Sequence, residues 1–160
     1  RMLALPRFDR ARVREDLVLA ADAERVFALD LELGELLWER RGPGRPLALA
    51  VGPDVAALAF EGAAGDGSLW LVEARDGEPL VAPLAVGGVA AELELDEQRV
   101  HALVRGRRGS VAVRAWSAAG SGAGLELWER ELLGASAPSA AHGLARDAGC
   151  VWAALGALLV

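Results

Sequence analysis

Apolar and polar residues alternate in short stretches along this chain. The alternation is clearest at residues 16–21 and 91–96, and it is strict over 91–96. A period of two residues is typical of a β-strand with one buried face. Turn sequences separate these stretches, for example Asp76-Gly77 and 120–122, and their glycines supply the positive φ angles of tight hairpins. The pattern therefore predicts consecutive strands, with helix over 32–40 as the competing interpretation.

The strand pattern repeats along the chain. Apolar stretches begin at residues 26, 69 and 111, at steps of 43 and 42 residues, and each precedes a glycine, namely Gly34, Gly77 and Gly124. Trp38 and Trp128 each stand four residues after the glycine of their copy, and the middle copy breaks this rule with Val81. A period of roughly 40 to 50 residues with strand content fits one four-stranded propeller blade per repeat.

The repeat predicts an all-β protein, a β-propeller segment of about three and a half four-stranded antiparallel blades. We expect a single segment over residues 1–160, with blades at about 1–41, 46–86 and 89–133 and a partial blade at 142–160. About three and a half blades do not close a ring, and ring closure is what protects blade faces and strand edges.

One copy of the repeat has a recognisable motif. The pattern Ala28-x-Asp30-x₃-Gly34-x₃-Trp38 resembles the tryptophan-docking repeat of the PQQ-like, quinoprotein-type β-propellers, in which the tryptophan packs against the neighbouring blade. Leu33 stands where that family usually has threonine. The resemblance implies a propeller fold and, in the quinone-dependent dehydrogenases of the superfamily, a quinone site covered by a disulfide of adjacent cysteines, with a calcium ion bound by acidic and asparagine side chains.

The chain departs from that enzymatic pattern. It contains a single cysteine, Cys150, and no asparagine, so it cannot form the disulfide within itself. Asp30 and Glu73 hold equivalent places in their repeats, which favours a structural role over a calcium site. We therefore assign no catalytic, cofactor-binding or metal-binding residue, and we expect no cofactor.

The composition restricts the available chemistry further. Lys, Tyr, Thr, Asn and Ile are all absent, which is typical of a GC-rich, bacterial genome and excludes lysine, tyrosine and threonine catalysis. His101 aligns with Trp152 one blade later, so we expect a ring that packs between blades. His142 falls on an expected loop, and the two histidines with Cys150 do not have a zinc-ligand spacing. Cys150 opens a predicted buried strand and is expected to be a core residue.

Charge points away from nucleic acid, because the net charge is −6 and phosphate recognition needs a basic face. Arginines crowd residues 1–14. A second cluster, Arg105, Arg107 and Arg108, surrounds a predicted hairpin tip and is our candidate for partner binding, with a solvated surface as the alternative. No apolar stretch has membrane length. The compartment, periplasm or cytoplasm, stays open.

These observations favour a non-catalytic propeller scaffold for protein–protein interaction. The partner is a protein or a second copy that completes the ring, and the chain is a fragment of a longer protein, half of a homodimer or a subunit of a mixed ring. The alternative is a propeller domain of a quinone-dependent or other enzyme whose active site lies outside these residues. A ligand-binding propeller is a third option, which the repeat positions of the tryptophans disfavour.

Overall fold

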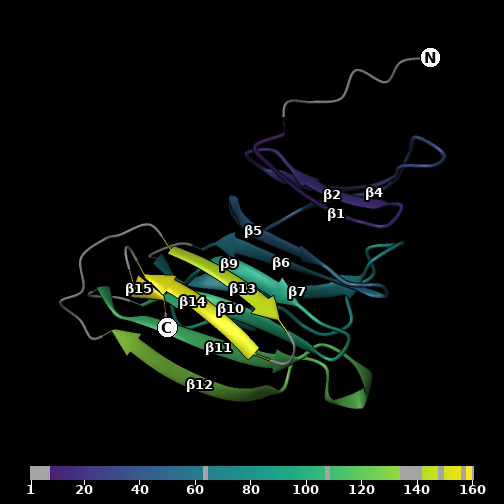
Figure 1. Ribbon diagram of the computed structural model, residues 1–160. Coiled ribbons are helices and arrows are strands. Elements are labelled where there is room, and N and C mark those ends of the chain that lie inside the picture. The colour runs from purple at the N-terminus through teal and green to yellow at the C-terminus, as the bar shows by residue number, and fades with distance from the viewer. Residues whose placement is uncertain are drawn as a thin grey trace.

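The computed structural model describes residues 8–62, 65–106, 109–133, 142–147, 150–155 and 158–159. These residues form four antiparallel β-sheets that follow one another in a row (Figure 1). Three sheets have four strands each and the last has three, and the strands of each sheet are neighbours in sequence order. This architecture confirms the predicted all-β propeller segment. We call the sheets blades 1 to 4, in chain order.

The strands of the first two blades are short and closely spaced in the sequence. Blade 1 consists of β1 (Arg10–Arg14), β2 (Leu17–Ala21), β3 (Arg25–Asp30) and β4 (Glu35–Arg41). Blade 2 consists of β5 (Pro46–Val51), β6 (Val55–Glu61), β7 (Gly67–Glu73) and β8 (Leu84–Ala85). Strand β4 covers most of the stretch for which helix was the competing interpretation, so the helical alternative is wrong.

The second half of the chain continues the pattern. Blade 3 consists of β9 (Val89–Leu95), β10 (Arg99–Arg105), β11 (Val111–Ser117) and β12 (Glu126–Leu133), with a short 3₁₀ helix, η3 (Gly120–Gly122), between the last two. Blade 4 consists of β13 (His142–Asp147), β14 (Cys150–Leu155) and β15 (Leu158–Leu159).

The repeat glycines form the turns between the third and fourth strands of blades 1 to 3. Gly34, Gly77 and Gly124 have φ angles of 67°, 72° and 81°, a left-handed conformation that glycine adopts without the steric penalty of a Cβ atom. The amide of Gly34 donates to the carbonyl of Asp30, and that of Gly77 donates to the carbonyl of Glu73. The repeat in the sequence therefore corresponds to equivalent turns between the third and fourth strands of the blades.

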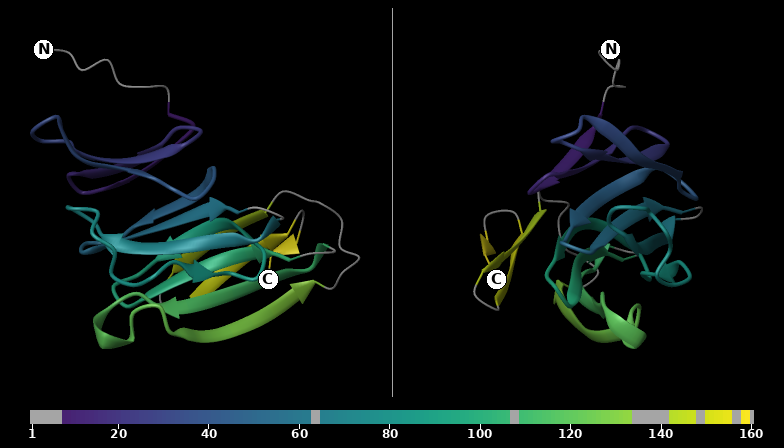
Figure 2. Two further views of the ribbon diagram at one scale, coloured as in Figure 1. Left: turned by 180° about the vertical axis from the view of Figure 1, so that it is seen from behind. Right: turned by 90° about the vertical axis from the view of Figure 1, so that its right-hand side faces the viewer.

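The blades are arranged around a common axis. The first strands of successive blades pack against one another, β1 on β5, β5 on β9 and β9 on β13. The fourth strands lie on the outside, as Figure 2 shows. This arrangement of radial four-stranded sheets is that of a β-propeller.

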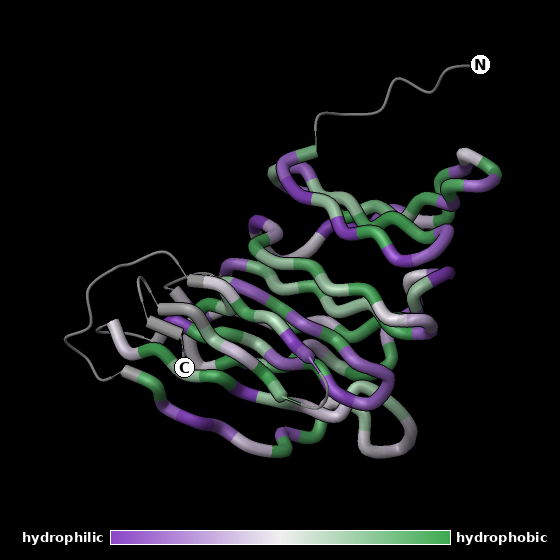
Figure 3. The backbone as a smooth tube through the Cα atoms, in the orientation of Figure 1, coloured by the Kyte–Doolittle hydropathy of each residue, from purple (hydrophilic) through white to green (hydrophobic). Residues whose placement is uncertain are grey.

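The core lies between the blades rather than inside any one of them. Trp38 of blade 1 packs with Leu58 and Phe60 of blade 2. Leu71 of blade 2 and Trp116 of blade 3 belong to the next apolar cluster, and a smaller cluster joins blades 3 and 4. Figure 3 shows the hydrophobic residues gathered along the strands. Each blade is thus stabilised mainly by its neighbours, because burial of apolar area is the main stabilising contribution.

Candidate interaction surfaces

The row of blades leaves one face of blade 1 without a neighbouring blade. Residues that alternate with the core positions lie on this face, and several are exposed: Val13 by 63%, and Leu36 by 45% of its surface. Phe8 covers part of the face, with its ring 5.6 Å from the ring of Phe27. Exposed apolar side chains that gather on one face, rather than being scattered singly, mark an interaction surface.

Comparison of equivalent residues shows that this face is built like a blade interface. Leu31, Ala74 and Ala118 each follow the third strand of their blade, and the amide of each donates to the loop before the second strand. Ala74 and Ala118 are only 1% and 0% exposed because a preceding blade covers them, whereas Leu31 is 55% exposed. The equivalent position is therefore buried in blades 2 and 3 and exposed in blade 1.

Blade 4 has a corresponding open face on its far side. Leu144 and Ala153 point toward blade 3, so the alternating residues of β14 point away from it. Among these, Trp152 is 44% exposed and Cys150 is exposed as well. The expectation that Cys150 is a core residue is wrong. Its strand is buried on one face only, because no further blade covers the other.

The arginines near the start of the chain have acidic residues of the same chain near them. Arg12 of β1 lies 3.6 Å from Glu92 of β9, so the pair joins blades 1 and 3 near the axis. Burial raises the pKa of the Glu94 carboxyl, while Arg12 and Arg146 act in the opposite direction. At least one of these arginines thus has an acidic partner within the chain itself.

The candidate arginine cluster lies partly outside the described residues. Arg105 ends β10 and is exposed, next to the turn that leads into β11. Arg107 and Arg108 lie outside the described residues. The structure therefore places one of the three candidates on the surface.

His101 lies between blades 3 and 4, with 3% of its surface exposed. Its ring centroid is 5.9 Å from that of Trp128, and both residues line a cavity of about 390 Å³ with Arg99 and Arg130. Burial lowers the pKa of the His101 imidazole. Trp128 is 39% exposed, whereas Trp38, at the same place in its repeat, is 7% exposed, so the tryptophan of the third copy is less covered by the following blade.

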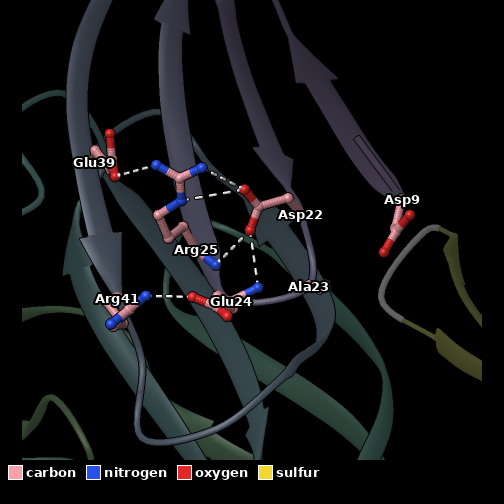
Figure 4. Close-up of a pocket in the computed structure, with 7 residues that line it drawn as sticks. All are labelled: Asp9, Asp22, Ala23, Glu24, Arg25, Glu39 and Arg41. Carbon is pink, nitrogen blue, oxygen red and sulfur yellow. Dashed lines mark hydrogen bonds and ion pairs between the residues drawn. The ribbon is translucent and has the colours of Figure 1, made fainter. Parts of the chain in front are cut away.

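A surface pocket lies on blade 1, at the turn between β2 and β3 (Figure 4). Arg25 donates to Asp22 and Glu39 at 2.9 Å each, and Arg41 pairs with Glu24. The two arginines therefore pair with three of the four carboxylates that line the pocket, which keeps a net negative charge. In the described part of the chain, no group of three or more His, Cys, Asp or Glu side chains could hold a metal ion. The described residues also contain no helix with the length and hydropathy of a membrane span.

Comparison with known proteins identifies the fold class. No protein-family model and no curated protein sequence matches the chain. Among solved structures, the WD40 domain of Toxoplasma gondii coronin is similar over 94% of this chain, at 13% identity and a TM-score of 0.74. BamB from Moraxella catarrhalis is similar over 89%, at 14% identity and a TM-score of 0.68. The chain is thus a β-propeller domain.

The relative lengths differ among these similar structures. This chain spans 40% of the coronin chain and 41% of the BamB chain. It spans 82% of the computationally designed protein Ika4, which is similar over 91% of this chain, at 15% identity and a TM-score of 0.68.

Incomplete ring closure predicted uncovered blade faces, but the sequence did not identify the residues exposed on them. Val13, Leu31 and Trp152 carry no motif and sit at ordinary strand or turn positions. The available signal was the combination of an apolar strand pattern with too few repeats to cover both end blades.

Proposed function

We propose that this chain is a non-catalytic β-propeller scaffold that mediates protein–protein interaction, and that residues 1–160 form one segment of a larger assembly or a longer chain. The observation that carries this proposal is the exposure of Leu31 at a position where Ala74 and Ala118 are buried under a preceding blade. A face with the construction of a blade interface fits another blade better than it fits a small ligand.

We also infer that the repeat is of the PQQ-like type. The geometry of Trp38 supports this assignment, because its indole N–H donates to the carbonyl of Ala74 in the next blade at 3.0 Å. Its ring also lies against Gly77. A tryptophan that docks on the following blade is the feature that the motif implies.

The arginine cluster is a second candidate surface for a partner. Arg105 is exposed at the end of β10, and with Arg107 and Arg108 it would present positive charge to an acidic partner. The open blade faces support the proposal more strongly than the arginine cluster does, because the evidence for them is a comparison of equivalent positions within the same molecule.

A photo-reactive residue tests the proposal without assuming the source of the partner. Benzoylphenylalanine would replace Leu31 in the cell that makes the protein, and mass spectrometry would identify the captured peptide. Leu125 is the matched control: it is 64% exposed and directly follows a repeat glycine, as Glu35 and Glu78 do. We expect capture of a strand-rich repeat peptide at position 31 and none at position 125. Equal capture at both positions, or no capture at position 31, would overturn the proposal.

A further inference from the structure

The repeat glycines are docking sites for the preceding blade. A Cβ atom on Gly77 would lie 2.8 Å from Cδ2 of Trp38, and one on Gly124 would lie 3.1 Å from Cγ2 of Val81. Each docking residue comes from the blade before. A Cβ atom on Gly34 would have nothing within 4 Å, although Gly34 has the same left-handed backbone. Among the three equivalent sites, the first is empty.

The inner part of the same face shows the same vacancy. Val13 pairs with Val18 across the first hairpin of blade 1, as Leu95 pairs with Val100 in blade 3. Leu95 is 7% exposed because blade 2 covers it, whereas Val13 is 63% exposed. The blade 1 face is therefore built like a blade interface both at Gly34 and at Val13, but no neighbouring blade covers it at either place.

The opposite end of the row supplies the matching face. Cys150 opens the second strand of blade 4, as Val55 opens that of blade 2 and Arg99 that of blade 3. Val55 packs against the cluster between blades 2 and 3, which includes Leu95. The residue that opens a second strand thus lies on the face turned to the next blade.

The same neighbourhood recurs between blades 3 and 4. Arg99 and Arg146 line one cavity of about 330 Å³. Arg146 pairs with Val151 across its hairpin, so it holds in blade 4 the place that Val13 holds in blade 1. The first residue of a second strand therefore lies near this first-strand position of the following blade at two interfaces of the chain.

We propose that a second copy of this chain docks its fourth blade on the open face of blade 1, head to tail, with its Cys150 beside Val13. The inference rests on the proposed function and names the partner. Each copy has one open face of each kind, so two identical head-to-tail contacts cover both faces and close the assembly. Two copies supply twice the four sheets of one chain, which is within the range of propeller rings.

The lengths of similar propellers agree with a second copy. The chain spans 40% and 41% of the coronin and BamB chains, and twice that share is about four fifths of either one. The chain also spans 82% of the computationally designed Ika4 protein. A second copy would therefore supply most of the length by which this chain falls short of the coronin or BamB chain.

A cross-linking experiment tests the register. The variant Val13→Cys carries two cysteines, because Cys150 is the only natural one, and a short bis-maleimide would join them between copies. We expect a covalent dimer from Val13→Cys, its loss in Val13→Cys/Cys150→Ala, and its return when that double variant is mixed with the wild-type chain. Glu97→Cys, at an exposed turn, is the matched control and should give no dimer.

Charged variants test the head-to-tail arrangement independently. Val13→Glu alone and Trp152→Arg alone should each have the 16.7 kDa mass of one chain by light scattering, and an equal mixture should have twice that mass. The mixture forms one natural contact and one Glu–Arg contact. A mixture that stays at the single-chain mass, or a Val13→Cys variant that cross-links no better than Glu97→Cys, would overturn the second-copy proposal. In that case capture of a different polypeptide at position 31 would leave the proposed function standing, and no capture would remove both.

Discussion

The indole N–H of Trp38 donates to the backbone carbonyl of Ala74 at 3.0 Å, across the interface between blades 1 and 2. Trp38 is 7% exposed and belongs to the apolar cluster that joins the two blades. The bond and the packing together fix the position of the outer strand of one blade against the next, so this tryptophan has a structural role.

Replacing Trp38 should therefore weaken the interface between blades 1 and 2 and lower the free energy of unfolding. Trp38→Ala should lower the free energy of unfolding by about 3–5 kcal/mol, because it removes a buried ring and leaves a cavity. Trp38→Phe should cost about 1–2 kcal/mol through the lost hydrogen bond to the Ala74 carbonyl. Urea denaturation followed by circular dichroism gives both values.

The matched control is Trp128, which holds the same place in blade 3 but is 39% exposed. Trp128→Ala should cost only about 1 kcal/mol, mostly from the ring contact with His101. A loss as large as that of Trp38→Ala would show that Trp128 is docked in solution, contrary to its exposure in this structure.

Gly77 should tolerate substitution less well than Gly34. Both have positive φ angles, so an alanine at either position should cost about 1–2 kcal/mol from the backbone alone. At Gly77 the added methyl group would also lie 2.8 Å from the Trp38 ring, which should cost a further 1–3 kcal/mol or so. The measurement is the difference between the two denaturation midpoints, and equal midpoints would contradict docking at Gly77.

The turns and strands were predictable because their signals are local. Gly34 and Gly77 stand four residues after the end of a strand pattern, and the left-handed turn needs only the glycine itself. The tryptophan motif similarly predicted an inter-blade contact for Trp38. Local turn chemistry and a two-residue period are enough to define a blade.

Burial at the ends of the row was not predictable from the same signals. Cys150 and Trp152 lie in an apolar strand that looks like any other, but their exposure depends on whether a further blade stands beside them. The ion pair of Arg12 with Glu92 joins residues 80 positions apart in the sequence, and no local pattern marks it. Both features depend on the arrangement of whole blades.

Asp30 should contribute to stability although Glu73, at the equivalent position, should not. Oδ1 of Asp30 accepts from the amides of Glu32 and Leu33 at 2.9 Å each, and Oδ2 lies 3.5 Å from Nη1 of Arg75. Asp30 is 7% exposed, and Asp30→Ala would remove the acceptor of both turn amides, at a cost of about 1–3 kcal/mol for the two hydrogen bonds.

Two variants make this measurement specific. Asp30→Asn keeps the acceptor oxygen and should lose less than Asp30→Ala in urea denaturation. Glu73→Ala should change the free energy of unfolding by about 0.5 kcal/mol or less, since the Glu73 side chain is exposed. If Asp30→Ala and Glu73→Ala had the same effect, the turn would not depend on the carboxylate.

The stability of the fold should depend on pH through His101. Burial lowers the pKa of its imidazole from the ordinary value of 6.5, Arg99 and Arg146 act in the same direction, and Asp96 opposes them. The folded protein therefore resists protonation more than the unfolded chain does. Above the unfolded pKa neither state binds the proton, and as the pH falls below 6.5 only the unfolded state does, so stability is lost until the folded pKa is reached.

The variant His101→Phe isolates this contribution, since it keeps a ring beside Trp128 but cannot bind a proton. The difference in the free energy of unfolding between the wild type and His101→Phe should be constant above a pH of about 7. Below pH 6.5 the wild type should lose stability relative to His101→Phe. Glu94, whose raised pKa adds stability as the pH falls, is present in both proteins and cancels in the difference. Parallel stability curves over this range would show that His101 takes up its proton as readily in the folded protein as in the unfolded chain, and that the space between blades 3 and 4 is open to water.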